Sequence, residues 1–453
     1  MAKFHFELTS TPITSHVGLA FVGQALDEKK LANHLASVCP KRRNGGLVSD
    51  MDNVKAMIGL ICLGKPYFDA IAEYRDEPWF AMALGLQRLP SPETLRQRIQ
   101  SFPEKTGRVW RDFTTRLLAA NPGLLGQKIH GQTWTVIDCD VSPMDNSDTQ
   151  KEGVSWTYKN YAGYAPMFGY IGPYGLMLNN ELRPGSAHSN CAGTADWFDQ
   201  TLKMAGRVSP HRRLIVADSG NDSAENLEVF RRHADTDFLV KHNLRNDDPQ
   251  QWLDMAKEQT GEQEYEKLDR GAWAWYGERE MVLPGQQNVD DEQKVTQRVV
   301  FRATERFAHP DGQCISPHLV MIDAYWTSLD WTPEQVHACY NQRGTSEQYH
   351  SELKSDMGVE RLPSGKFAAN QQILDLAMIA YNLLRLMGQN MLRSGLVPRR
   401  KARSGRLRLR TVMQNLMYMA GRLVRHARRT VIRIFTGHGW ARPALALARG
   451  PDR

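Results

Sequence analysis

The strongest constraint on the fold begins at residue 132, where a helical pattern gives way to apolar, β-rich runs. The run "TWTVIDCDV" (133–141) is followed by "YAPMFGYIG" and "GLMLNNELRPG", with Gly and Pro residues between them. This spacing predicts three neighbouring antiparallel strands. A helix near 194–206, the apolar run "RRLIVADSG" (212–220), a helix at 222–234 and a strand at 238–244 follow. The order β-β-β-α-β-α-β predicts an α/β layer architecture.

The segment before this block has a helical pattern, with predicted helices at 17–37, 50–64, 67–76, 80–86 and 91–102. Ser91 is a suitable N-cap for the last of these helices, and Pro92 suits its first position. Short helices separated by Gly and Pro occur in helix-turn-helix DNA-binding domains and equally in ordinary helical bundles. Both interpretations stay open from the sequence alone.

Behind the block, residues 246–320 contain several short β candidates. A long helix begins at Thr332-Pro333-Glu334, and an amphipathic core helix is predicted at 370–392. We therefore divide the chain into a helical DNA-binding domain (1–130), a core in two parts (131–245 and 321–398), a β-rich insertion (246–320) and an Arg-rich C-terminal segment (399–453).

Composition excludes several classes of protein. The 453 residues are 41% hydrophobic and 24% charged, as in an ordinary soluble protein. The start, "MAKFHFELTS", has no apolar signal region, and no apolar run approaches the length of a membrane span. Six cysteines without a C-x-x-C pair argue against a zinc site and a disulfide framework. We expect a cytoplasmic protein that makes no membrane contact.

Positive charge is concentrated at one end of the chain. Residues 399–453 contain fourteen Arg and one Lys against a single acid, whereas the whole chain has a net charge of only +7. Such segments bind polyanions, nucleic acid first among them, although some are only solvated tails. The stretch "GRLRLRTVM" alternates Arg and Leu, so as a strand it would present Arg406, Arg408 and Arg410 on one face to grip DNA. The following "RLVRHARR" is predicted as a helix, and an RNA-binding or subunit-contact role fits this region nearly as well.

Two acidic residues at strand ends are candidates for a metal site. Asp140 ends the first apolar strand, with Asp138 on the same strand face, and Asp218 ends the run "LIVADSG". Sites gather at strand ends in open α/β sheets. Converging carboxylates repel each other, and Mg²⁺ or Mn²⁺ relieves that repulsion while also binding phosphates. Two such ions about 4 Å apart would activate a hydroxyl and stabilise a leaving oxygen. A single strand-end Asp is more often a cap or a surface residue, so the prediction depends on the combination.

The stretch "YNQRGTSEQYHSELK" adds the third carboxylate. On a helix, Arg343, Glu347 and Lys354 lie at about 300°, 340° and 320° from Tyr340, which gives one narrow polar stripe. Such a stripe can face water, or it can face an anionic ligand. Glu352 is a second acid on this helix, but it is rotated by about 140° from Glu347, so we prefer Glu347.

Together these residues resemble a known family. The pattern Y-x2-R-x3-E-x6-K, the D-x-[ST] element Asp140-Val141-Ser142 and the element Asp218-Ser219-Gly220 are similar to DDE transposases of bacterial insertion sequences that carry a Tyr-Arg-Glu-Lys motif. The insertion-sequence group numbered thirteen-eighty is the most similar in this respect. The resemblance covers roughly residues 130–390.

The resemblance implies an RNase H-like mixed-sheet core interrupted by a β-rich insertion, flanked by the N-terminal helical domain and the basic C-terminal segment. It implies Mg²⁺-dependent cut-and-paste transposition, with the metal held by Asp140, Asp218 and Glu347, and with Asp138 able to approach it. Arg343 and Lys354 would hold phosphate oxygens, and Tyr340 would donate a hydrogen bond to the DNA backbone. Whether a DNA hairpin forms stays open.

Relatives of this kind also flip a base against an aromatic residue in the insertion. Trp273 and Trp275 are candidates for that stacking, and aromatic packing within a hairpin is the competing interpretation. The implied partners are transposon-end DNA with terminal inverted repeats and target DNA, bound by a homodimer associated with the bacterial nucleoid. A metal-dependent nuclease without strand transfer and an inactive DNA-binding descendant are the alternative functions.

Overall fold

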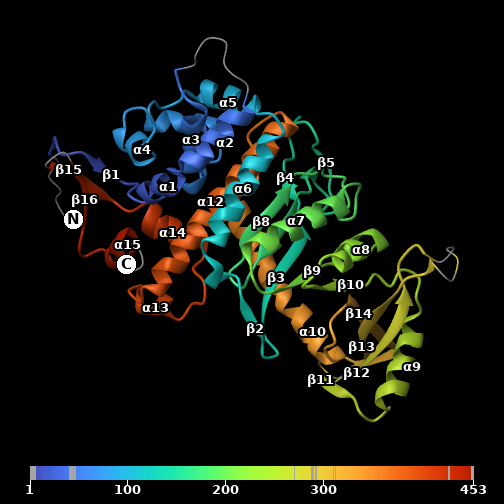
Figure 1. Cartoon of the computed structure of the whole chain (residues 1–453). Coiled ribbons are helices and arrows are strands. Elements are labelled where there is room, and N and C mark those ends of the chain that lie inside the picture. The colour runs from blue at the N-terminus through green and yellow to red at the C-terminus, as the bar shows by residue number, and fades with distance from the viewer. Residues whose placement is uncertain are drawn as a thin grey trace.

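The structure is a computed structural model that describes residues 7–39, 47–269, 271–286, 290, 293–309, 311, 313–426 and 429–449. Figure 1 shows a helical part that holds both ends of the chain and an α/β part built on a large sheet. The long helix α12 (Phe367–Arg393) runs through the helical part and packs against strand β8 (Leu176–Glu181) of the sheet. The two parts are therefore joined by extensive packing.

Five strands form the central region of the sheet. They are β3 (Gln132–Val141), β7 (Met167–Ile171), β8, β9 (Arg212–Ala217) and β10 (Thr236–Lys241). Strand β7 lies antiparallel between β3 and β8, whereas β9 lies parallel beside β3, and β10 lies parallel beside β9. The three predicted antiparallel strands after residue 132 are confirmed, and the sheet is mixed.

The two faces of β3 have different partners because side chains alternate along a strand. Ile137 and its odd-numbered neighbours belong to a core with helices α7 (Thr194–Val208) and α8 (Ala224–Arg232). Asp138 and Asp140 lie on the opposite face. That face is covered by the segment that begins with helix α10 (Pro333–Asn341). The acidic residues are therefore enclosed between the sheet and this segment.

The predicted insertion extends the same sheet. It contains α9 (Pro249–Thr260), β11 (Glu266–Asp269), β12 (Ala272–Val282), β13 (Thr296–Ala308) and β14 (Cys314–Thr327). Strand β14 pairs antiparallel with β10, so the insertion is continuous with the central sheet. Helix α9 packs on β12, β13 and β14. Figure 1 shows this region at the end of the molecule farthest from both chain ends.

The long helix predicted from Thr332 starts where expected. The Thr332 side chain caps it together with Gln335, and Pro333 takes the first position. The helix is not regular, however. A 3₁₀ turn (Gln342–Thr345) follows α10, then come α11 (Ser346–Ser351) and a π-type turn (Glu352–Asp356). Mid-helix turns of these kinds are frequent at functional sites.

The N-terminal segment is helical, as predicted. Its elements are α1 (Leu19–Leu26), α2 (Lys29–Val38), α3 (Asp50–Cys62), the 3₁₀ segment η1 (Phe68–Tyr74), α4 (Pro78–Ala83), α5 (Pro92–Gln100) and α6 (Thr106–Ala119). Ser91 caps α5 through the backbone N–H of Thr94, as expected. The single helix predicted at 17–37 is wrong, because the backbone leaves the helical conformation at Asp27 and Glu28.

The C-terminal segment completes the core of the N-terminal one. Helices α13 (Arg399–Ala402), α14 (Leu409–Val412) and α15 (Ala441–Arg449), a π-type turn (Met413–Met417) and strands β15 (Gly421–His426) and β16 (Arg429–Ile434) make up this segment. Strand β1 (Ile13–Thr14) pairs with β15. One hydrophobic cluster joins residues from α1 to α15 around α12, so the core crosses the predicted boundaries at 130 and 398.

Two predictions for the C-terminal segment are wrong. The "GRLRLRTVM" stretch is a loop leading into α14 and not a strand, because Leu407 and Leu409 are buried while the neighbouring arginines pair with acids. The "RLVRHARR" stretch begins as strand β15 and not as a helix, because it pairs with β1 and β16.

Short elements complete the description. They are a 3₁₀ turn (Pro122–Leu124), strand β2 (Gln127–Ile129), the small sheet of β4 (Met144–Asp145), β5 (Ser155–Trp156) and β6 (Ala162–Tyr164), and a 3₁₀ turn (Ser219–Asn221). Within the described ranges, the length and hydropathy needed to cross a bilayer are not met by any helix.

Candidate active site

Two of the predicted metal ligands are neighbours at the sheet. The register pairs Asp138 with Val216 and Cys139 with Ala217, so Asp140 and Asp218 follow at adjacent carboxyl ends of parallel strands. Burial raises the pKa of Asp218, and the negative charge of Asp140 raises it further. The parallel register of β3 and β9 thus brings these two acids to the same edge of the sheet.

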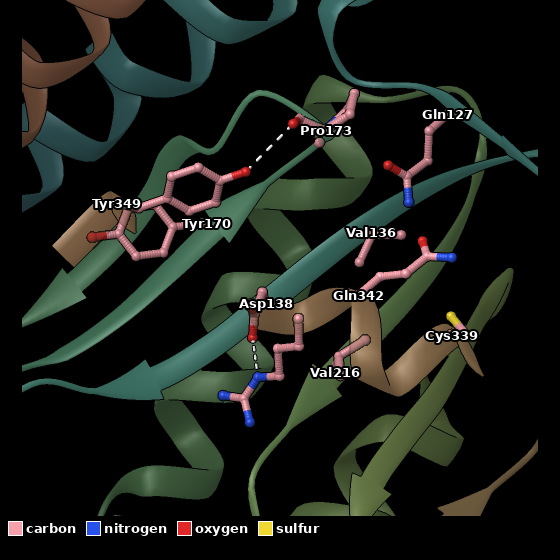
Figure 2. A pocket seen from close by; sticks show the side chains of 11 residues that line it. Gln127, Val136, Asp138, Tyr170, Pro173, Val216, Cys339, Gln342 and Tyr349 are labelled. Carbon is pink, nitrogen blue, oxygen red and sulfur yellow. Dashed lines mark hydrogen bonds and ion pairs between the residues drawn. The ribbon is translucent and has the colours of Figure 1, made fainter. Parts of the chain in front are cut away.

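Arg343 occupies the centre of the acidic group. Its Nε donates to Asp138 Oδ1 at 2.6 Å, which Figure 2 marks with a dashed line. Its Nη2 donates to the Cys139 carbonyl at 2.8 Å and lies 3.6 Å from Asp140 Oδ1. Burial opposes the charge on this guanidinium, but Asp138 and Asp140 outweigh it and hold the pKa of Arg343 above its ordinary value. The arginine is the cation that balances the acids in this conformation.

Asp138 and Asp140 differ in how well neighbouring positive charges stabilise their ionised forms. Burial raises the pKa of Asp138, although its ion pair with Arg343 opposes the rise. Burial also acts against ionisation of Asp140, but His350 and Arg343 outweigh it and lower the pKa of that carboxyl. Asp140 is thus the better anionic ligand of the two, whereas Asp138 is engaged by the arginine.

His350 also contacts the site, whereas the sequence alone favours a structural or surface role for this residue. Its Nε2 lies 3.7 Å from Asp140 Oδ2 and has no hydrogen-bond partner in the described part of the chain, although the atom is buried. Its Nδ1 lies 3.3 Å from the hydroxyl of Tyr170. The signal that could have found it is its position three residues after Glu347, on the same side of the helix.

Glu347, the third predicted ligand, lies between two residues that contact Asp140. Arg343 precedes it by four positions and His350 follows it by three, with part of the 3₁₀ turn Gln342–Thr345 between Arg343 and Glu347. Its side chain is exposed and forms no ion pair among the described residues. In this conformation the structure does not join it to Asp140 and Asp218.

The donor set fits a hard divalent cation in part. Carboxylate oxygens are the ligands that Mg²⁺ prefers, and Asp140 and Asp218 supply them from two strand ends. Among the residues that the structure describes, no group of three or more His, Cys, Asp or Glu side chains is arranged to hold a metal ion. The third ligand would have to come from the facing helix, where Glu347 is the exposed carboxylate.

Tyr340 and Lys354 reach the same region from the two ends of the helical segment. The Tyr340 hydroxyl accepts a hydrogen bond from Arg343 at 3.2 Å, and its ring lies 4.7 Å from the ring of Tyr325. Lys354 donates from Nζ to the carbonyl of Pro143, and burial lowers its pKa. Tyr340, Arg343 and Lys354 therefore all lie close to the end of β3, as the predicted stripe implies.

Glu352 has a structural environment and not a catalytic one. It is buried, pairs with Arg385 at 2.8 Å and with Arg406, and accepts from the backbone N–H of Leu409 at 2.8 Å. Asp356, one turn later, is paired with Arg408 at 2.7 Å and with Arg410 at 3.2 Å. All three arginines predicted to grip DNA thus brace the end of the helix. The side chains of Arg408 and Arg410 remain about half exposed.

The two tryptophans of the insertion are packed within it. Trp275 is buried, donates to the carbonyl of Glu262 at 3.1 Å and has the Lys257 ammonium 4.6 Å from its ring centroid. Trp273 stacks on Tyr265 at 4.5 Å and meets Phe307 edge-on at 4.7 Å. These contacts are those of the competing interpretation, aromatic packing within a hairpin.

A cavity of about 450 Å³ lies beside the acids, between the sheet and the helical segment. Figure 2 shows Asp138, Val136 and Val216 on the sheet side, with Gln342 and Cys339 opposite them. The 3₁₀ turn that begins at Gln342 borders this cavity. The irregular part of the helix is therefore the part that lies over the site.

Comparison with known proteins identifies the family of the chain. A family model described as Transposase DDE domain group 1 matches residues 3–447. Among solved structures, the chain is similar to piggyBac transposase in a cryo-EM structure of its synaptic complex with hairpin DNA. The TM-score is 0.42 at 11% identity, over 91% of this chain and 82% of that chain. No curated protein matches the sequence. Because the family model spans nearly all of the chain, the protein belongs to the DDE transposases of group 1.

Proposed function

We propose that this transposase cuts DNA at transposon ends and joins them to target DNA in a reaction that depends on Mg²⁺ or Mn²⁺. The observation that carries the proposal is the pair of carboxylates, Asp140 and Asp218, at adjacent strand ends beneath the helix that bears Arg343, Glu347 and Lys354. We further propose that the core is RNase H-like. The order of three antiparallel strands followed by two parallel ones supports it.

Asp140 and Asp218 would hold the metal ion, with Glu347 as the ligand from the helix. When bound there, a divalent cation lowers the pKa of a water or hydroxyl and stabilises the leaving oxygen of a phosphodiester. The positively charged side chains of the protein have a different role. Arg343 contacts Asp138 and Asp140, and Lys354 contacts Pro143 just after β3, so both place positive charge where the DNA backbone must approach carboxylates. A planar guanidinium and a compact ammonium both bind phosphate oxygens well.

The proposed partners are transposon-end DNA with terminal inverted repeats and target DNA, with two copies of the chain holding two ends. Proximity of both ends to one acidic site would let a freed 3′-hydroxyl attack target DNA. The Tyr-Arg-Glu-Lys pattern and its insertion-sequence group stay part of this proposal. The exposed faces of Arg408 and Arg410 are retained as secondary DNA contacts.

A DNA cleavage assay tests the proposal. The substrate is a duplex carrying the inverted repeat that brackets the gene, incubated with Mg²⁺ and a target plasmid. Joined product is expected from the parent protein, and neither cuts nor joined product from Asp140→Asn or Asp218→Asn. Nicks without joining would identify a nuclease that lacks strand transfer.

One observation favours the inactive descendant as a second candidate. Glu347 is exposed and is not gathered with the other two acids among the described residues. If the parent protein binds its end DNA but makes no cut with Mg²⁺ or with Mn²⁺, this second function replaces the first.

A further inference from the structure

An exposed aromatic turn lies beside the acidic pair. Strands β5 and β6 are joined by a tight turn in which the Thr157 N–H donates to the Tyr161 carbonyl at 2.9 Å. Asn160 donates back to the Thr157 carbonyl at 3.1 Å and has a φ of 62°, a conformation that Asn tolerates better than most residues. The turn is therefore fixed by its own hydrogen bonds.

The turn exposes two large rings. Trp156 is 65% exposed and Tyr158 is 62% exposed, whereas Thr157 between them is buried at 2%. Both rings are therefore largely in solvent, on a turn that buries the residue between them. Single exposed aromatic residues need no explanation, but two rings on one fixed turn next to a candidate active site suggest a binding surface.

Hydrogen bonds tie this turn to the strand end that carries Asp140. The Tyr158 hydroxyl lies 3.5 Å from the Val141 carbonyl, and the Tyr161 hydroxyl donates to the Pro143 carbonyl at 3.0 Å. Lys354 donates to the same Pro143 carbonyl. Burial, followed by the charges of Asp140 and Asp218, raises the pKa of Tyr158 to about 12, in keeping with a hydroxyl close to both acids.

Positive charge accompanies the rings. The Lys159 ammonium lies 5.4 Å from the centroid of the Tyr158 ring, and Lys354 donates to the same Pro143 carbonyl as Tyr161. Aromatic faces flanked by cations are how proteins hold unpaired nucleotides, since the bases stack and the phosphates meet the cations. A base within an intact duplex has no free face, so the occupant must be a base that is opened or terminal.

We propose that Trp156 and Tyr158 form an aromatic platform on which a base of the DNA strand next to the cut stacks while its phosphate is presented to Asp140 and Asp218. This inference deepens the proposed function and depends on it. It also assigns the stacking role to this turn and not to Trp273 and Trp275, whose rings are packed inside the insertion.

The test combines changes in the protein with changes in the DNA. Full-length parent, Tyr158→Ala and Trp156→Ala proteins bind end duplexes in which each base next to the cut is replaced in turn by an abasic site. Binding is measured in EDTA, so that no cut occurs. An aromatic-base stack is worth about 5- to 150-fold in affinity. At one position we expect the abasic site to weaken DNA binding by the parent protein by such a factor. For one alanine variant, the affinity for that abasic duplex should stay within about two-fold of its affinity for intact DNA.

Control variants separate the loss of base stacking from other causes of weaker DNA binding. Tyr158→Phe keeps the ring and should bind as the parent does, and Tyr67→Ala removes an exposed tyrosine elsewhere. Melting temperatures show that the variants are folded. If the protein and DNA changes add independently at every position, or if Tyr158→Phe behaves as Tyr158→Ala, the platform is overturned.

A second readout distinguishes this inference from the proposed function. A 2-aminopurine placed at the same position should change fluorescence on binding to the parent and not to the ring-deleted variant. If that signal and the abasic coupling are present but no cleavage follows with metal, the proposed chemistry fails and the platform stands. If Tyr158→Ala and Trp156→Ala cleave at the parental rate and show no coupling to the abasic sites, the platform is wrong and the proposed function stands.

Discussion

Two glutamates five residues apart on one helical segment have opposite environments. Glu352 is buried and is held by Arg385, Arg406 and a backbone N–H. Glu347 is exposed and forms no ion pair among the described residues. A buried carboxylate with all its partners supplied by the chain has no capacity left for a ligand. The exposed one keeps that capacity, so the comparison separates a residue that maintains the helix from one available to metal or DNA.

The largest expected effect is on folding at the buried member of the pair. Glu352→Ala leaves Arg385 as an uncompensated buried charge, which should cost about 3–5 kcal/mol of unfolding free energy. Denaturant unfolding followed by circular dichroism measures this. Glu347→Ala is the matched control and should cost no more than an average surface substitution. Equal losses in the two variants would end the distinction.

The reverse pattern is expected for catalysis. Glu347→Gln should lower the cleavage rate by about 10³-fold, since a metal ligand supports several kcal/mol of transition-state stabilisation. Its unfolding free energy should stay at the parental value. Glu334→Gln, an exposed glutamate on α10, is the control and should cleave normally. A variant Glu347→Gln that cuts as fast as the parent would remove Glu347 from the site.

A third carboxylate extends the comparison to the pH dependence of unfolding. Asp375 on α12 is as buried as Glu352, but its Oδ2 has no hydrogen-bond partner among the described residues. Burial raises its pKa to about 7, so the folded protein keeps a proton that the unfolded chain releases at about pH 4. Stability from this group is therefore full at low pH and is lost as pH rises to 7. Asp375→Asn should flatten that decline by a few kcal/mol. An unchanged pH profile of unfolding would contradict the assignment.

The smallest effect on stability is expected at Arg410, the more exposed of the two arginines that pair with Asp356. Arg410→Ala should change the unfolding free energy by less than about 1 kcal/mol, because Arg408 still binds Asp356 through two hydrogen bonds. The slope of log K for DNA against log salt should be smaller by about one, because Arg410 shares the single charge of Asp356 with Arg408 and is proposed to bind a phosphate. An unchanged slope would remove Arg410 from the proposed DNA contacts.

Local sequence predicted the parts of the fold that depend on periodicity. Strand β3 and strand β9 are apolar runs that end at Asp140 and Asp218, and parallel neighbours place such ends together. The start of α10 at Thr332 follows from capping chemistry. The helical spacing of Tyr340, Arg343 and Lys354 puts them on one stripe, so these residues could be expected near the acids.

The remaining features depend on contacts between distant residues. The Arg-Leu alternation after Gly405 predicted a strand, but Glu352 and Asp356 hold it as a loop. No spacing connects Tyr158 with Val141 at the end of β3, because a separate turn brings them close. The 3₁₀ turn after α10 lies over the sheet, whereas the π-type turn pairs with arginines from α12 and the C-terminal segment, and a regular 100° periodicity shows neither.

The pairing of β1 with β15 has a consequence for synthesis of the protein. The first helices leave the ribosome long before the C-terminal residues that pack on them, so their apolar faces stay uncovered until those residues have been synthesised. A copy of the gene interrupted by a late stop codon should therefore yield an aggregating or degraded product, and not a trimmed protein that still occupies DNA.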